Sequence, residues 1–203
     1  MAQWERGNLV AMAVDSPTAP ETRRFTADEV WRMVGAGIIH EDEPVELIDG
    51  QLIIVSPRGW SHASSIGHFN RILSLAYGEH YTVRVQAPLG GLQDHIPEPD
   101  IAVGLTDGPW DVDRRHPRGD ELLVVAEVVV TTHWLARRKI AIYAEAGAPI
   151  YWLVDVPRRQ VIVHEGPRPD GTWERVTTLP ETAELTLPGL GKPLPVAKIL
   201  PAA

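Results

Sequence analysis

The sequence predicts a single domain of the α/β or α+β class, built on a mixed central β-sheet that is flanked by helices. Its length of 203 residues fits one domain. A hydrophobic content of 44% against 23% charged residues provides a packed core. The apolar patterns alternate between helix and strand along the chain, which is typical of a mixed sheet. We expect the domain to span residues 23–200, after a flexible N-terminal tail over residues 1–22.

The composition excludes several classes of site and places some limits on partners. Cysteine is absent, which excludes thiol nucleophiles, thiolate zinc sites and disulfides. No apolar run is long enough for a secretory signal or a membrane helix, so we expect a cytoplasmic protein without membrane contact. The formal net charge is −8, and any contact with nucleic-acid phosphates must therefore come from a local basic patch.

Local signals in the first part of the chain predict a helix, a hairpin and a second helix. Residues 26–29 have the spacing of a capping box, which predicts a short helix after them. An Asp-Gly pair lies between two apolar runs in residues 45–55, which is a strong hairpin signal and places Glu46 on the first strand. Ser61 is expected to cap a helix that runs to about Gly78, with His62 in its first turn.

The second part of the chain alternates between predicted strands and one helix. The most apolar run, residues 122–130, is rich in β-branched residues, so we expect it to lie at the centre of the sheet and to be buried on both faces. A helix is predicted over 134–146, ended by Gly147. Residues 106–120 are expected to form a loop. Further strands are predicted over 81–89, 101–105, 150–154 and 160–164, with peripheral strands over 172–178 and 184–187.

Three residues in this pattern are candidates for chemistry: Asp100, Glu127 and Lys139. A charged Glu127 among valines would cost several kcal/mol unless it met a cation or a metal, or had a raised pKa. Each candidate also has an interpretation without a chemical function. Glu127 could be a paired residue at a solvent-facing strand edge, and Asp100 could only open a strand. Lys139 could be a solvated residue beside two arginines. Lysine occurs only at positions 139, 192 and 198, whereas arginine is otherwise the cation of this chain. Two carboxylates on adjacent strands suit Mg²⁺, and a nearby lysine can position water or offset developing charge.

Several segments in combination resemble the Uma-two family of restriction-endonuclease-like proteins, in the PD-(D/E)XK nuclease superfamily. The segments are Glu46-Leu47-Ile48-Asp49-Gly50, residues 56–62, Pro97-Glu98-Pro99-Asp100, residues 123–128 and residues 139–155. The resemblance covers about residues 22–165. It implies a restriction-endonuclease-like core in which Asp100 and Glu127 bind Mg²⁺ or Mn²⁺. It also implies that the lysine has moved from the strand, where Val129 stands, to the helix at Lys139. Glu46 and His62 match two further polar positions near that centre.

One segment departs from the family pattern. Relatives have an Asp four residues before the lysine, whereas this chain has Leu135. His133 could substitute in part, or it could be a loop or cap residue. His62 has a similar alternative, as a first-turn histidine without a function.

The resulting expectation is a metal-dependent endonuclease that acts on DNA. Asp100 and Glu127 would hold the metal, Lys139 would act on the water or the transition state, and Glu46 and His62 would assist. DNA would bind through Arg114, Arg115, Arg118, Arg137 and Arg138, unless these arginines are only solvated surface, and a homodimer is expected. The alternative is a catalytically degenerate nuclease fold that binds nucleic acid or protein. A small-molecule hydrolase finds no support, because the chain has no Gly-x-Ser-x-Gly, Walker-type or His-Glu-x-x-His motif.

Overall fold

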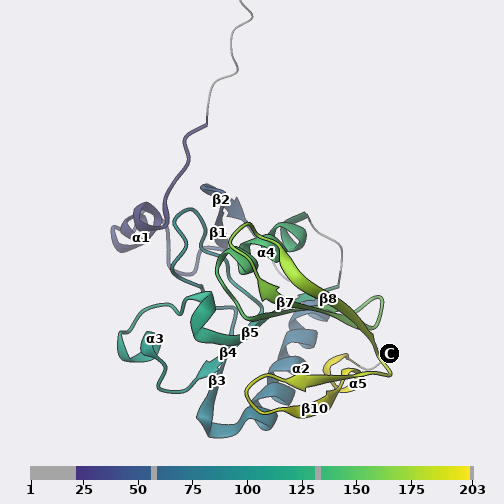
Figure 1. Cartoon of the computed structure of the whole chain (residues 1–203). Helices are drawn as coiled ribbons and strands as arrows, with labels where there is room; N and C mark the ends of the chain where they lie inside the picture. The colour runs from purple at the N-terminus through teal and green to yellow at the C-terminus, as the bar shows by residue number, and fades with distance from the viewer. Residues whose placement is uncertain (1–21, 56–58, 131–133, 202–203) are drawn as a thin grey trace, which may run out of the picture.

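The fold is a six-stranded mixed β-sheet with helices on both faces (Figure 1), which confirms the predicted class. The structure, a computed structural model, describes residues 22–55, 59–130 and 134–201. The expected tail, apart from its last residue, and His133 lie outside the described residues. Within the described part, no helix combines the length and the hydropathy needed to cross a bilayer.

The strands of the main sheet follow one another in chain order. They are β3 (Tyr81–Val85), β4 (Ile101–Leu105), β5 (Leu122–Val129), β6 (Ile150–Asp155), β7 (Gln160–Pro167) and β8 (Trp173–Pro180). All neighbours are antiparallel except β5 and β6, which are joined by the crossover helix α4 (Trp134–Glu145). β5 is one of the two middle strands and six of its eight residues are buried, as the sequence predicts.

The two faces of the sheet are covered by different helices (Figure 1). Helix α2 (Trp60–Tyr77) packs Phe69 and Leu73 against Ala126 and its neighbours on one face. Helix α4 packs Tyr143 against Val125 on the other face. This division follows from the alternation of side chains along a strand, which sends Ala126 and Val125 to opposite sides. The α2 side is completed by the helices η1 (Gly78–His80) and α5 (Val196–Ile199) and by the hairpin of β9 (Glu184–Leu187) and β10 (Lys192–Pro195).

The N-terminal segments form a small cluster beside α4. Helix α1 (Ala27–Gly35) begins with the predicted capping box, in which Thr26 Oγ1 accepts a hydrogen bond from the Glu29 amide. β1 (Val45–Ile48) and β2 (Gln51–Ile54) form the predicted hairpin. Asp49 and Gly50 have φ values of 52° and 71°, which fits the two left-handed positions of a type I′ turn. A bridge between Leu47 and Ile96 holds this hairpin against the rest of the domain.

Three local predictions need correction. Gly59, not Ser61, is the N-cap of α2, and the Ser61 carbonyl instead accepts a hydrogen bond from Ser65 Oγ. β3 ends at Val85 because the next residue, Gln86, has a left-handed φ of 50°, so the strand does not continue to residue 89. The predicted loop over residues 106–120 contains α3 (Pro109–Val112) and the start of the 3₁₀ helix η2 (Gly119–Glu121).

Candidate functional site

The candidate site lies where β4 begins and β5 ends, between the sheet and α4. Asp100 directly precedes β4, Glu127 is in β5, Lys139 is in α4 and Glu46 is in β1. All four are buried, with exposed fractions of 1%, 8%, 3% and 2% in that order. The fold thus brings together four of the five residues that the sequence singles out, and His62 adjoins them.

Lys139 connects two of the carboxylates. Its Nζ donates hydrogen bonds to Glu46 Oε1 at 2.9 Å and to Glu127 Oε1 at 3.1 Å. A third hydrogen bond, of 2.9 Å, goes to the backbone carbonyl of Glu98. An ammonium group has three donors, so all of them are used. The alternative of a solvated Lys139 is therefore wrong.

Glu127 lies in a middle strand of the sheet and is buried. The alternative of a Glu127 at a solvent-facing strand edge is therefore also wrong. Besides Lys139, its Oε1 accepts a hydrogen bond of 2.6 Å from the Tyr143 hydroxyl. The register of β4 and β5 pairs Ile101 with Ala126. Asp100 and Glu127 therefore occupy the next pair of opposite positions in this antiparallel register.

Asp100 is fixed by the neighbouring strand and by α2. Its Oδ2 accepts a hydrogen bond of 2.8 Å from the amide of Val128, and His62 Nε2 lies 3.2 Å from the same oxygen. Asp100 directly precedes β4, as expected for a residue that only opens a strand, but its side chain is also buried. The other ring nitrogen of His62, Nδ1, is buried and has no hydrogen-bond partner among the described residues.

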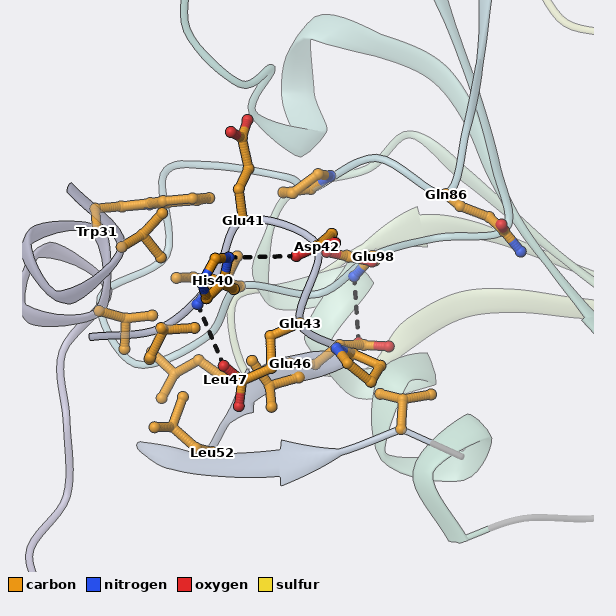
Figure 2. Close-up of a pocket in the computed structure, with 18 of the residues that line it drawn as sticks. Trp31, His40, Glu41, Asp42, Glu43, Glu46, Leu47, Leu52, Gln86 and Glu98 are labelled. Carbon is orange, nitrogen blue, oxygen red and sulfur yellow. Dashed lines mark hydrogen bonds and ion pairs between the residues drawn. The ribbon is translucent and has the colours of Figure 1, made fainter. Parts of the chain in front are cut away.

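Glu46 reaches the site because the hairpin is held against the loop before β4. Its Oε2 accepts a hydrogen bond of 3.2 Å from the amide of Glu98 (Figure 2). The tip of the hairpin is fixed as well, since the amide of Asp49 donates to His95 Nδ1 at 3.0 Å. Arg138 of α4 binds the Asp49 carboxylate with its shortest contact at 2.7 Å. These contacts set the position of Glu46 relative to Lys139.

Burial and charge act together on the ionisable groups of the site. Burial raises the pKa of Glu127 to about 8, the ammonium of Lys139 opposes this rise, and the charges of Asp100 and Glu46 add to it. Burial lowers the pKa of Lys139, but the attraction of Glu127 and Glu46 outweighs it and leaves the pKa above its usual value. Burial also raises the pKa of Tyr143, which therefore stays protonated and donates to Glu127. Among the described residues, the site holds three carboxyl groups and one ammonium, and a bound cation would favour the ionised form of Glu127.

The donor set suits a hard divalent cation in its chemistry. In the described ranges, no three His, Asp or Glu side chains are grouped so that they could enclose a metal ion. Mg²⁺, however, typically binds through one or two carboxylates and keeps several waters. Asp100 and Glu127, which offer carboxylate oxygens on adjacent strands, fit this pattern.

A hollow of about 470 Å³ opens beside the site (Figure 2). Glu46 and Glu98 line it together with Trp31 and Gln86. The segment over residues 40–43 forms another part of its wall and carries three exposed acidic side chains. This side of the site is therefore acidic.

The five arginines expected to bind phosphates do not form one patch. Arg138 pairs with Asp49 and Glu145 and so has a structural role. Arg115 and Arg118 pair with neighbouring carboxylates, at 2.6 Å and 3.2 Å. Arg114 and Arg137 are exposed, and neither makes an ion pair with another residue that the structure describes. The single patch of the sequence-based prediction is therefore corrected to separate clusters.

Leu135 lies in the first turn of α4, four residues before Lys139. Residues at this spacing share one helix face, so an Asp at position 135 would lie on the side of the lysine. Leu135 is half-buried and places an apolar side chain there.

Two contributors to the site were missed by sequence reasoning. Tyr143 is four residues after Lys139 in the same helix, and this spacing could have identified it. The carbonyl of Glu98 carries no signal in the sequence, because any residue type offers the same acceptor.

Comparisons with known proteins identify the family and the fold of this chain. The family model Uma2, described as "Putative restriction endonuclease", matches residues 28–197. The fold is similar to the crystal structure of a "putative nuclease belonging to DUF820" from Anabaena variabilis, with a TM-score of 0.60 and 17% identity. That similarity covers 86% of this chain and 97% of the other. Comparison with the curated proteins gives no match. The family match extends over most of the domain and includes all the residues of the candidate site, and this chain belongs to the Uma2 family of restriction-endonuclease-like proteins.

Proposed function

We propose that this protein hydrolyses phosphodiester bonds of DNA in a reaction that depends on Mg²⁺ or Mn²⁺. The observation that carries the proposal is the convergence of Glu46, Glu127 and Lys139 within hydrogen-bonding distance, beside Asp100. A buried group of this kind is expensive to maintain for stability alone, because desolvation of the charges offsets much of their attraction. Membership of a family described by nuclease activity supports the same reading.

In this proposal, Asp100 and Glu127 are the metal-binding acids. A bound divalent ion would supply a more acidic water and would neutralise charge on the phosphate. The chain itself keeps both carboxylates in place: the Val128 amide holds Asp100, and the Tyr143 hydroxyl holds Glu127. Neither carboxylate has to reorganise when substrate arrives.

Lys139 provides a positive charge beside these acids, since its Nζ lies 3.1 Å from Glu127 Oε1. Glu46 and the Glu98 carbonyl accept hydrogen bonds from its ammonium and orient it. When water attacks phosphorus and the bond to the leaving oxygen breaks, negative charge grows on the phosphoryl oxygens, and a fixed ammonium stabilises it. His62 has an unpartnered Nδ1 among the described contacts and is suited to accept a proton or to donate to a phosphate.

A binding module without catalysis is the second candidate. Two observations favour it: Leu135 replaces the acidic residue of the family pattern, and Lys139 already uses all its donors within the chain. Such a protein would retain the fold and bind nucleic acid or protein, but would not hydrolyse it.

Cleavage assays with a matched pair of variants separate the two candidates. Glu127→Gln removes one proposed metal ligand with little change in shape, whereas Glu174→Gln removes an exposed carboxylate of β8. We expect the wild type and Glu174→Gln to cleave single- or double-stranded DNA with Mg²⁺ or Mn²⁺, and Glu127→Gln to lose about a hundredfold or more in rate. A wild type that cleaves no DNA with either metal would contradict the proposal and favour the binding module. Cleavage that survives Glu127→Gln would place the chemistry elsewhere.

A further inference from the structure

A second hollow, of about 620 Å³, adjoins the acidic hollow beside the candidate site and has the opposite charge. Its charged lining consists of arginine: Arg84, Arg114, Arg115 and Arg118. The remaining lining residues are Trp31, His116, Gly90 and Gly91. Among the residues that the structure describes, no Asp or Glu lines it. We refer to this hollow as the arginine pocket.

Arg84 is the most informative residue of the arginine pocket. It is half-buried on β3, and its Nε is buried without a hydrogen-bond partner among the described residues. Its guanidinium lies 5.2 Å from the centre of the Trp110 ring and makes no ion pair within the described ranges, although Asp111 attracts it electrostatically. A buried guanidinium donor without an acceptor is costly. An anion in the pocket would supply that acceptor.

The walls of the arginine pocket are tied together by the backbone. The amide of Gly90 donates a hydrogen bond of 2.9 Å to the carbonyl of Pro117. At Gly91, with φ of 87°, a Cβ would lie 2.8 Å from Cγ of Arg118, so only glycine allows the arginine stem to lie this close. Arg115 and Arg118 are further positioned by Glu121. Arg84 and Arg114 are the two arginines of the pocket that make no ion pair with a described residue.

Arg84 of the arginine pocket lies on the same face of the sheet as Glu127, and the pocket shares a wall with the hollow beside the candidate site. The strand register aligns Arg84 with Ala102 and Ala102 with Val125, and Glu127 is two residues further along β5 on the same face. Trp31 and His116, whose rings stack at 4.9 Å, line both the arginine pocket and the hollow that contains Glu46. A chain of phosphates could therefore pass from the pocket over this stack to the site.

We propose that the arginine pocket binds a backbone phosphate of the nucleic-acid strand, next to the phosphodiester that is cleaved. The proposal rests on the proposed function for the identity of the strand, and it adds Arg84 and Arg114 as its phosphate-binding residues. Charge supports this direction of approach, because the other wall of the site carries the acidic side chains of residues 41–43 and repels phosphates.

The test measures binding separately from cleavage. Fluorescence anisotropy of dye-labelled single-stranded and duplex DNA is recorded in EDTA, so that no metal-dependent cleavage occurs. The variants are Arg84→Met, which keeps most of the side-chain stem, and Arg114→Gln. Arg71→Gln is the matched control, because Arg71 is an exposed arginine of α2 that lines neither hollow. Melting temperatures show whether each variant is folded.

We expect Arg84→Met and Arg114→Gln each to weaken DNA binding roughly tenfold. Each should also reduce the slope of log affinity against log salt by about 0.7 to 0.9, the value for one phosphate contact. Arg71→Gln should change neither quantity. Unchanged affinity and slope in folded Arg84→Met and Arg114→Gln would overturn the proposal. Inorganic phosphate at millimolar concentration is added as a competitor of DNA strands of different length. If it displaces short and long strands equally well, the arginine pocket is a site for the free phosphate ion, and the assignment to a nucleic-acid strand is overturned.

These outcomes are independent of those for catalysis. If the wild type binds DNA in an Arg84-dependent manner but cleaves nothing, the arginine pocket stands and the nuclease proposal fails. If the wild type cleaves DNA but Arg84→Met binds it as tightly as before, the nuclease proposal stands and the pocket fails.

Discussion

Lys139 is the residue on which the candidate site depends most strongly, both for stability and for the proposed reaction. It is the ammonium between Glu46 and Glu127, and all three side chains are buried. Its loss would leave two buried carboxylates without their cation. Because all three groups are buried, we expect the loss of Lys139 to have a large effect on stability.

We predict that Lys139→Ala lowers the free energy of unfolding by about 3–5 kcal/mol, the range for breaking one side of a buried ion pair. Lys139→Arg should keep much of this stability, because it keeps the positive charge. Both variants should lose cleavage, since a planar guanidinium does not place its charge at the same point. Urea unfolding and DNA cleavage assays measure the two quantities. An active Lys139→Arg variant would reduce Lys139 to a structural cation.

His164 gives a prediction for pH. It is buried in β7, where its ring faces Tyr151 and Trp173. Burial lowers its pKa below the usual value of 6.5. Because the unfolded chain then binds the proton more readily than the folded one, stability from this group is present above about pH 6.5 and is lost as the pH falls below it.

The prediction for His164 is tested with His164→Phe, which keeps an aromatic ring but cannot titrate. The melting temperature of the wild type should fall between about pH 6.5 and 5 more steeply than that of His164→Phe. His80→Gln, at an exposed position, is the control and should follow the wild type. Parallel curves for the wild type and His164→Phe would show that His164 does not contribute.

At the scale of elements, the β1–β2 hairpin determines whether Glu46 reaches Lys139. The hairpin is short, and its turn contains Gly50 at φ 71°. A Cβ at this position would lie 2.8 Å from Cβ of Arg24. The turn therefore requires glycine both for its conformation and for space.

We predict that Gly50→Ala lowers the free energy of unfolding by about 1–2 kcal/mol and slows cleavage, because a displaced hairpin moves Glu46. Gly67→Ala is the matched control, since Gly67 is inside α2 and a Cβ there meets nothing within 4 Å. This second change should stabilise the protein by about 0.5–1 kcal/mol and leave cleavage unaffected. If both variants cleaved DNA at the wild-type rate, the position of the hairpin would not matter for the reaction.

The same hairpin shows what could be predicted from the sequence and what could not. The Asp-Gly turn, the capping box before α1 and the apolar strand β5 follow from residues close together in the chain, and all were predicted correctly. The predicted N-cap of α2 was wrong because Ser61, two residues after the true cap Gly59, offered a stronger local signal. Local signals therefore identify elements better than their ends.

Local sequence signals could not predict contacts between residues that are far apart in the chain. Arg138 pairs with Asp49 across 89 positions of the chain, and this pairing removes it from the basic patch that the sequence suggested. Lys139 contacts Glu46 across 93 positions, which only the family resemblance anticipated. Tyr143 could have been found from its spacing to Lys139, whereas the Glu98 carbonyl could not.

On the scale of the whole molecule, two hollows of opposite charge adjoin one another beside the candidate site. The acidic segment over residues 40–43 and Glu46 line one hollow, and the arginine pocket adjoins that hollow through Trp31 and His116. This arrangement explains how a chain with a net charge of −8 could bind a polyanion from one direction. In the proposed function, the buried carboxylates Asp100 and Glu127 bind a divalent cation beside these hollows.

Calorimetric titration of the full-length chain with Mn²⁺ tests that claim most directly, with the wild type compared with Asp100→Asn, Glu127→Gln and the surface control Glu174→Gln. We predict that the wild type and Glu174→Gln bind Mn²⁺ with the same affinity, and that Asp100→Asn and Glu127→Gln each weaken this binding at least tenfold while remaining folded. Equal Mn²⁺ affinity in all four proteins, or no binding by the wild type, would contradict a metal site formed by Asp100 and Glu127.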